Sequence, residues 1–247
     1  MFTEYSPSHG YDEYFSANAH PRSTLQPLIS SLGRMGLEQL NRNHAAASML
    51  LKRLGATFRL NDSGRQGVER ILPFDPLPRL IRAQEWAQLE RGLFQRLEAI
   101  DHFLADVYGE GRICRDGVVP REAIESSQGW RPAMQGIKPP LGRWCHISGL
   151  DLVRDGQGRW RVLEDNLRCP SGVAYFLENR RVMKRIFPSL FNGPTVQPID
   201  NYASRLLETL CDLAPWTEAP RVVLLTPGVY NSAYFEHSYL AQQMGIP

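Results

Sequence analysis

The chain has 247 residues, of which 43% are hydrophobic and 22% are charged, as in ordinary globular proteins that bury one large core or two small ones. Its formal net charge of +2 is too small, and its basic residues too dispersed, for a surface that binds nucleic acid. No apolar run approaches the roughly 20 residues of a membrane-spanning helix, so we expect no membrane partner and a cytoplasmic location.

The first quarter of the chain predicts an arm, a helix and a short strand. Residues 1–30 are rich in Pro, Ser and His and predict an irregular arm. Between Leu37 and Leu54 the apolar positions step by three and four, which predicts a helix ended by Gly55. Residues 56–60 predict a strand, and residues 61–64 predict the turn that closes it.

The next part predicts a loop followed by the strongest helix. Three prolines between residues 73 and 78 exclude a helix there and predict an extended loop. Residues 83–108 then carry a continuous apolar stripe at helical spacing, and a shorter helix is expected after Pro120. The four cysteines of the chain lie far apart, without a Cys-x-x-Cys pair, so we expect them to be reduced and to bind no zinc.

Residues 145–172 are the most informative stretch. Two runs of alternating polarity flank Asp155-Gly156-Gln157-Gly158, which predicts a β-hairpin. Glu164 and Asn166 are two apart and share one face of the second strand, and Asp151 on the first strand can lie across from them. Two carboxylates and an amide oxygen suit Mg²⁺, which keeps waters and takes substrate phosphates as its other ligands.

The same hairpin permits a second interpretation, and spacing alone favours it. The carboxylates could face solvent and pair with Arg154 and Arg161, without any metal.

The last third predicts two helices and one strand–helix unit. A helix is expected between Gly172 and Pro188, and another over residues 199–213. The apolar run Arg221–Thr226 predicts a strand of a parallel sheet, followed by a glycine turn and a helix that Asn231-Ser232 could cap and that runs through Met244. Because one such unit cannot bury its own faces, we expect the fold to be incomplete and the chain to be the N-terminal part of a longer protein.

Four segments together carry a family resemblance. The first is the hairpin with the loop that follows it, Arg168-Cys169-Pro170-Ser171-Gly172. The others are GVERILPFDPLPR from Gly67, FLENR from Phe176 and LTPGVYNSAYFEH from Leu225. With these blocks the chain resembles the circularly permuted ATP-grasp ligases of type 2, related to glutathionylspermidine synthetase, from residue 30 onward. In that family an Asp on one strand and Glu-x-Asn on the next hold the metal.

The resemblance implies an α+β fold in three parts. Residues 1–30 would be the arm, and residues 31–215 the metal-binding half of a permuted ATP-grasp domain, a mixed sheet with helices. Residues 216–247 would begin a Rossmann-like (pre-ATP-grasp) substrate domain as its first βα unit. The half that grips ATP with lysines is expected beyond Pro247, so the isolated chain is expected to be inactive or nearly so.

The resemblance also implies a reaction. It is the Mg²⁺- and ATP-dependent ligation of a carboxylate to an amine, on small molecules or peptides, through an acylphosphate. Asp151, Glu164 and Asn166 would hold the metal. Two rivals stay open: a non-catalytic ATP-grasp-like module that binds a peptide or nucleotide for a partner protein, and a scaffold whose acidic hairpin has no ligand. A protein partner or a homo-oligomer is compatible with either.

Arginines are the candidates for catalysis, Arg168 and Arg70 first. Arg168, two residues past Asn166, could extend the same face toward a phosphate, or be a surface arginine. Related synthetases carry an arginine two positions before the metal-binding Asp, where this chain has Gly149. Arg70, Arg79 or Arg168 could take its place.

Two further groups are candidates for binding. Ser171 and Gly172 open a helix whose free N–H groups would favour a nucleotide phosphate, although a plain helix cap is more common. The other group clusters at the last glycine turn, where open α/β sheets bind ligands, and predicts a site for the acceptor substrate. It consists of Asn231, Tyr234, Glu236 and His237, of which His237 could equally be an ordinary helix residue.

Overall fold

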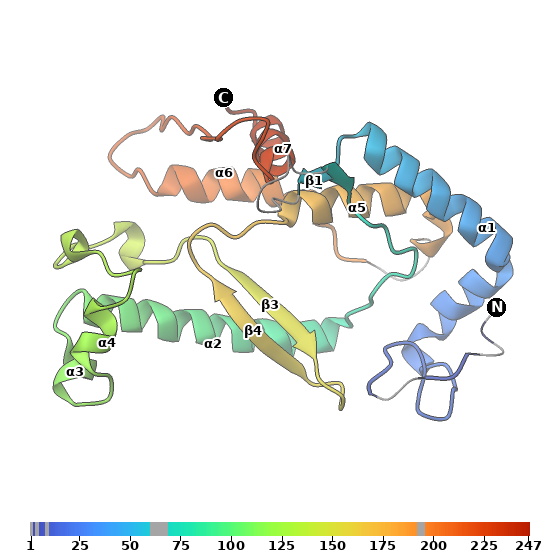
Figure 1. Cartoon of the computed structure of the whole chain (residues 1–247), viewed down its shortest axis with the longest axis horizontal. Helices are drawn as coiled ribbons and strands as arrows, with labels where there is room; N and C mark the ends of the chain where they lie inside the picture. Colours follow the sequence, from blue (N-terminus) through green and yellow to red (C-terminus); the bar gives the residue numbers. More distant parts are fainter. Residues whose placement is uncertain (1, 3–4, 8–9, 60–68, 192–195) are drawn as a thin grey trace.

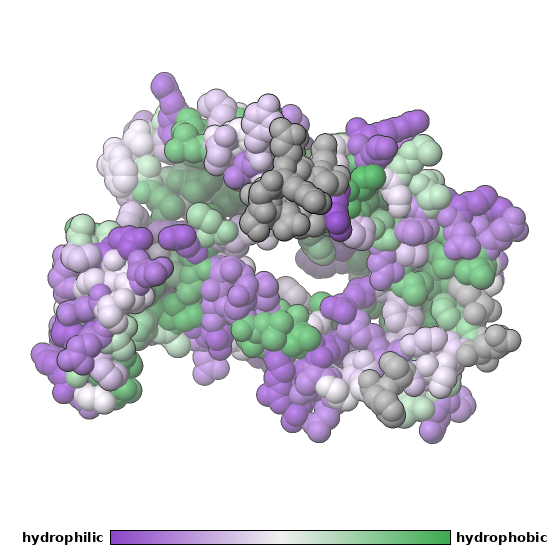
Figure 2. Space-filling model, viewed as in Figure 1, coloured by the Kyte–Doolittle hydropathy of each residue, from purple (hydrophilic) through white to green (hydrophobic). Residues whose placement is uncertain are grey.

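The computed structural model describes residues 2, 5–7, 10–59, 69–191 and 196–247, and its helices lie in two parts (Figure 1). The upper part in this view contains α1 (Gln26–Arg53), α5 (Val173–Ile186), α6 (Tyr202–Asp212) and α7 (Tyr234–Met244). The lower part contains α2 (Ala83–Val107) and a hairpin that crosses it. Figure 2 shows that the molecule is hollowed between the two parts.

The strands form two separate antiparallel pairs. Strand β1 (Thr57–Arg59) pairs with β2 (Glu69–Ile71), and β3 (Gly149–Arg154) pairs with β4 (Trp160–Asn166). An α+β fold is thereby confirmed, but in the part of the chain that the structure describes no strand joins the pairs into one mixed sheet. Strand β2 was not predicted. Leu60, the turn expected at 61–64 and the first two residues of the Gly67 block lie outside the described residues.

Short elements gather beyond the C-terminal end of α2. They are α3 (Arg112–Arg115), α4 (Arg121–Glu125) and two 3₁₀ turns, Pro132–Met134 and Pro140–Gly142. Helix α4 follows Pro120 as predicted. The rings of Trp130 and Trp144 stack on Tyr108, with centroid distances of 4.6 and 5.0 Å, and so fasten the segment that leads into β3.

Helix α1 begins earlier than expected and takes part of the predicted arm. A 3₁₀ turn at Ser23–Leu25 leads into it, and Pro27 suits its first turn, because the fixed φ of proline matches a helix. Gly36, at φ 76°, kinks the helix. The arm is not irregular throughout, because it is helical from Ser23 onward, and Phe15 and Leu25 are buried in the core.

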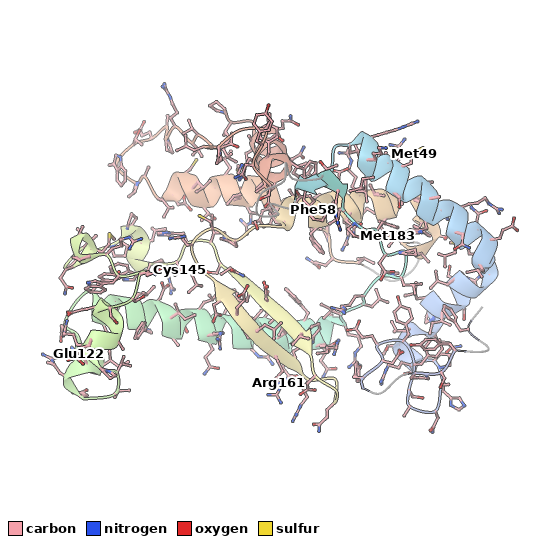
Figure 3. All side chains as sticks on the ribbon, viewed as in Figure 1. Met49, Phe58, Glu122, Cys145, Arg161 and Met183 are labelled. Carbon is pink, nitrogen blue, oxygen red and sulfur yellow. The ribbon has the colours of Figure 1, made fainter. Side chains whose placement is uncertain are left out.

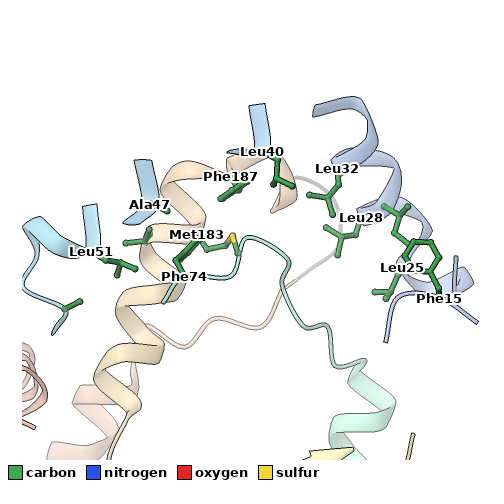
Figure 4. Close-up of a cluster of buried hydrophobic side chains, with 13 residues drawn as sticks. Phe15, Leu25, Leu28, Leu32, Leu40, Ala47, Leu51, Phe74, Met183 and Phe187 are labelled. Atoms are coloured by element: carbon green, nitrogen blue, oxygen red, sulfur yellow. The ribbon is translucent and has the colours of Figure 1, made fainter. Parts of the chain in front are cut away.

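The main core lies between α1 and α5 (Figure 4). Leu51 on α1 and Val182 on α5 are almost fully buried, and the rings of Phe74 and Phe187 stack at 6.1 Å. Helix α5 ends just before Pro188, as predicted. By contrast, most of the stripe on α2 is only half-buried, and the two-stranded hairpin contacts that helix through side-chain hydrogen bonds and ion pairs.

The strand predicted at Arg221–Thr226 is absent, which corrects the expected βα unit. The segment has no regular structure, and Leu225 is 88% exposed. A strand needs a neighbour for its backbone groups, and here Leu224 donates its N–H to the carbonyl of Pro247. Helix α7 begins at Tyr234, two residues after the cap predicted at Asn231-Ser232, and runs through Met244 as expected. None of the helices in the described part of the chain is long and apolar enough to cross a bilayer.

Candidate metal centre

The register of the β3–β4 hairpin brings the three predicted metal ligands to one place. Asp151 pairs directly with Glu164, and Gly149 pairs with Asn166. Directly paired residues of an antiparallel ladder have their side chains on the same face, and Asn166 follows Glu164 by two positions. The three side chains therefore lie side by side, as the sequence predicted.

A β-bulge decides which face of the hairpin they occupy. Asp151 pairs with Glu164 but Leu152 pairs with Val162, so Leu163 is the extra residue and has no partner. An extra residue reverses the alternation of side chains along the strand. Glu164 therefore lies on the face opposite Val162, although residues two positions apart in a regular strand share a face.

Contacts with α2 identify that other face. Glu85 on α2 accepts a hydrogen bond from Trp160 Nε1 at 3.0 Å and pairs with Arg154 Nη1 at 2.7 Å. Arg96 on the same helix binds Asp165 with both of its forked nitrogens, at 2.7 and 2.6 Å. The face that carries Trp160 and Asp165 thus lies on α2. The metal set, which consists of Asp151, Glu164 and Asn166, points away from that helix.

The distances within the set fit a small cation. The terminal amide of Asn166 places Nδ2 3.1 Å from Glu164 Oε1 and 3.4 Å from Asp151 Oδ1. Octahedral ligands about 2.1 Å from Mg²⁺ lie about 3 Å from one another. A half-turn of the amide exchanges its nitrogen for its oxygen, which would complete an all-oxygen set. The residues present therefore fit a magnesium ion.

The two carboxylates of the metal set are not neutralised by ion pairs with the described residues. Among the described residues no ion pair includes Asp151 or Glu164. Arg154 pairs with Glu13 and Glu85, and Arg161 pairs with Asp155. Arg161 lies toward the turn of the hairpin, away from α5 (Figure 3). The interpretation in which Arg154 and Arg161 neutralise the acidic set is wrong.

Asp155 stabilises the turn between β3 and β4. Backbone N–H groups of Gln157 and Arg159 donate to its carboxylate, and hydrogen bonds led by that from the Arg159 backbone hold the pKa of Asp155 below its usual range. A three-member cluster of His, Cys, Asp or Glu is absent from the described residues, so the candidate centre depends on the amide of Asn166.

Asp101 supports the start of the hairpin and was not predicted. It is buried on α2, and its Oδ1 accepts the backbone N–H groups of Trp144 and Cys145 at 2.9 and 3.1 Å. Arg143 approaches its other oxygen at 3.3 Å. The signal in the sequence was an aspartate inside the apolar stripe of the predicted helix, where a charge needs partners.

The arm supports the other end of the hairpin. Glu13 bridges Arg79 at 2.8 Å and Arg154 at 3.0 Å. The ring of Tyr11 lies against Gly158, where a Cβ would come within 2.4 Å of it. Nothing in the local sequence pattern signals these contacts.

The predicted anion site at the start of α5 is already filled. Gly172 donates its N–H to both oxygens of Glu236, at 2.9 and 2.8 Å, and Ala174 donates to Oε1 at 2.9 Å. Glu236 is 4% exposed. The expectation of free N–H groups at Gly172 is therefore wrong, because a carboxylate of the chain occupies the helix terminus. Ser171 next to it is exposed.

The two catalytic candidates are not brought together in one sheet. Arg168 is exposed two residues beyond Asn166. Arg70 is exposed on β2, paired opposite Phe58 in the other sheet.

The four predicted acceptor residues divide into two groups. Asn231 and Tyr234 line a pocket of about 290 Å³, together with Thr57, Phe58 and Phe235. Phe58 lies in the upper part of the molecule, near α5 (Figure 3). His237 and Glu236 do not line it: His237 Nδ1 lies 2.9 Å from Thr226 Oγ1, and Glu236 caps α5. None of the residues that line this pocket is charged.

Comparisons with known proteins cover most of the chain. A family model described as circularly permuted ATP-grasp type 2 matches residues 78–247. An uncharacterized protein of Synechocystis sp. is 55% identical over 244 residues, which are 98% of this chain and 50% of that protein. One of Mycobacterium tuberculosis is 46% identical over 237 residues, 96% and 42% of the two chains.

A protein of Frankia alni is also similar. It is named "Putative glutamate--cysteine ligase 2-3" and is 38% identical in an alignment of 251 positions, which covers 100% of this chain and 28% of that protein. The chain thus spans half, or less, of the length of these relatives.

Proposed function

The chain belongs to the circularly permuted ATP-grasp type 2 family, and on that premise we propose that the complete protein containing it is a Mg²⁺- and ATP-dependent ligase. It would join a carboxylate to an amine. One observation carries the proposal: Asp151, Glu164 and Asn166 converge on an exposed face of the hairpin, and neither carboxylate has an arginine partner among the described residues.

The name of the Frankia alni relative supports the class of reaction. A glutamate–cysteine ligase joins a carboxylate to an amine. The matched part is 28% of that protein, so its name supports a ligase here and indicates no particular acid or amine.

The proposed reaction has two steps. The carboxylate oxygen attacks the γ-phosphorus of ATP, ADP leaves, and an acylphosphate forms. The amine nitrogen then attacks the acyl carbon, and inorganic phosphate leaves as the C–N bond forms and the amine loses a proton. Bound Mg²⁺ would neutralise charge on the phosphate oxygens.

The residues of this chain have separate tasks in that scheme. Asp151 and Glu164 would hold the cation, and the amide of Asn166 would complete its protein ligands. Arg168 lies two residues beyond the end of β4. We propose that its planar guanidinium binds a phosphate. Arg70 lies on β2 in the other sheet, and this position does not support a role at the same phosphate.

The organisation of the chain follows from these tasks. We propose that residues 31–215 contain the metal-binding half of the permuted domain. Residues 216–247 would then contribute to the acceptor substrate through the pocket at Asn231 and Tyr234. That pocket has no charged lining residue and suits an uncharged part of a small-molecule or peptide substrate.

Calorimetry on the complete protein tests the metal centre. We expect Mg·ATP to bind, and Glu164→Gln and Asn166→Ala each to weaken binding tenfold or more, since each removes a ligand. Glu98→Gln, at an exposed carboxylate of α2, is the control and should bind like the wild type. Unchanged affinity in both site variants would contradict the site.

Phosphate release then tests catalysis. The ligase requires phosphate release that depends on both a carboxylate and an amine. Mg·ATP binding without phosphate release, over a panel of such pairs, would instead indicate a binding module.

A further inference from the structure

Six residues connect the last metal ligand to helix α5. This connecting loop, residues 167–172, follows Asn166 directly and contains Arg168. Its path therefore decides where the end of β4 and the guanidinium of Arg168 lie. The structure holds this loop at two points.

The first point lies on the hairpin itself. Gly149, the register partner of Asn166, has the side chain of Pro170 packed directly over it. A Cβ at Gly149 would come within 2.7 Å of Pro170 Cβ, closer than two carbon atoms can approach. The absence of a side chain at Gly149 thus lets the connecting loop fold back over the hairpin.

The second point is Glu236, in the first turn of α7. Its carboxylate accepts the N–H groups of Gly172, the N-cap residue of α5, and of Ala174 in its first turn, which have no partner within the helix. A negative charge at a helix N-terminus is also favourable electrostatically. This contact joins residues more than 60 positions apart, and the Glu236 side chain is buried.

The same turn of α7 also borders the pocket. Tyr234 and Phe235 line it, and the ring of Phe235 lies 5.0 Å from that of Tyr175 on α5. Tyr175 in turn donates its hydroxyl to the carbonyl of Thr57, another residue of the pocket. Burial, followed by the charge of Glu236, raises the pKa of Tyr175 and of Tyr202. Glu236 therefore stands between the pocket and the connecting loop.

We infer that Glu236 is a positioning residue of the proposed ligase, which fixes the connecting loop so that Asn166 and Arg168 are held in place, and which couples the pocket to the metal centre. The inference rests on the proposed function. It replaces the expectation that Glu236 binds the substrate, because its buried carboxylate is committed to the N–H groups of α5.

Mg²⁺ titration of nucleotide binding tests this role in the complete protein. In Glu236→Gln one acceptor oxygen becomes an N–H donor facing Gly172, so we expect the Mg²⁺ concentration for half-maximal ATP binding to rise about tenfold. Glu236→Ala should show a larger rise, and acetate, but not acetamide, should restore part of the affinity by binding in the space of the lost carboxylate.

A second readout needs no nucleotide. Hydrogen exchange at the amides of Gly172 and Ala174 should quicken in Glu236→Ala and slow again with acetate. Val182→Ala, at the far end of the same helix, serves as the control for general destabilisation. At an equal loss of Tm it should leave the Mg²⁺ requirement unchanged.

The outcomes separate the two proposals. If Glu164→Gln weakens Mg·ATP binding and Glu236→Gln does not, the inference is overturned and the proposed function stands. An equal rise in Val182→Ala would also overturn the inference, because stability alone would explain it. A wild type that binds no Mg·ATP would overturn the proposed function, and the inference with it.

Discussion

Arg96 on α2 grips Asp165 on β4 through two nitrogen–oxygen contacts of 2.7 and 2.6 Å, on the face of the hairpin opposite the metal set. Asp165 lies between Glu164 and Asn166 in the strand, and successive side chains of a strand point to opposite faces. By holding Asp165 toward α2, Arg96 orients both neighbours away from that helix. A contact outside the centre thus determines where the centre faces.

The Arg96–Asp165 pair predicts a pH dependence of stability. The hydrogen bond from Arg96 holds the pKa of Asp165 below its ordinary value. Such a carboxylate contributes stability above its unfolded pKa of about 3.9, and loses that contribution as the pH falls through the lower folded value. Arg96→Gln should therefore lower Tm modestly near neutral pH, since the pair is partly exposed, and the difference should shrink below about pH 4.

Thermal denaturation between about pH 7 and pH 3 measures this difference. Arg91→Gln, an exposed arginine on the same helix, is the control. A difference between Arg96→Gln and the wild type that stays constant to the acid end of the range would contradict the prediction.

Asp101 predicts an asymmetry between two substitutions. Asp101→Ala leaves the N–H groups of Trp144 and Cys145 without an acceptor, which should cost about 2–3 kcal/mol in the free energy of unfolding. Asp101→Asn keeps an amide oxygen in the position of Oδ1, which accepts both bonds, and should cost less. Urea unfolding compares the two, and an equal loss in both variants would show that the acceptor is not what matters.

The bulge at Leu163 predicts that one deletion in β4 is tolerated. Deleting Leu163 makes Val162 and Glu164 consecutive, so the two side chains stay on opposite faces and Glu164 still pairs with Asp151. We therefore expect the deletion variant of the complete protein to keep Mg·ATP binding, measured by calorimetry. Leu163→Thr keeps the bulge at an exposed position and is the control, which should bind like the wild type. Loss of binding in the deletion variant alone would contradict the prediction.

Gly149 predicts the effect of installing the arginine that related synthetases carry. Gly149→Arg forces a Cβ into Pro170, and crowding of this kind costs about 1–3 kcal/mol. The double variant Gly149→Arg/Pro170→Gly should recover part of that stability, because it removes the atoms that clash. Thermal denaturation of the two variants measures the recovery. No recovery would mean that something other than Pro170 excludes a side chain there.

Local patterns predicted most of the elements near the centre. Alternating polarity around Asp155–Gly158 predicted the hairpin, and the spacing of Glu164 and Asn166 predicted their common face, because both are properties of a single strand pair. Helix α2 followed from periodicity in the same way, and the end of α5 followed from Pro188. The strand at Arg221–Thr226 failed because apolar residues alone do not make a strand, and no described segment pairs with it.

The sequence by itself therefore determined the family, the hairpin and the identity of three oxygen-bearing side chains, since these depend on neighbours a few residues apart. The tertiary structure alone decided which face they occupy, through Leu163 and the grip of Arg96 on Asp165. It also decided that Glu236, not a ligand, caps α5. Contacts between residues more than 60 positions apart depend on how whole helices pack, and packing leaves no periodic trace in the chain.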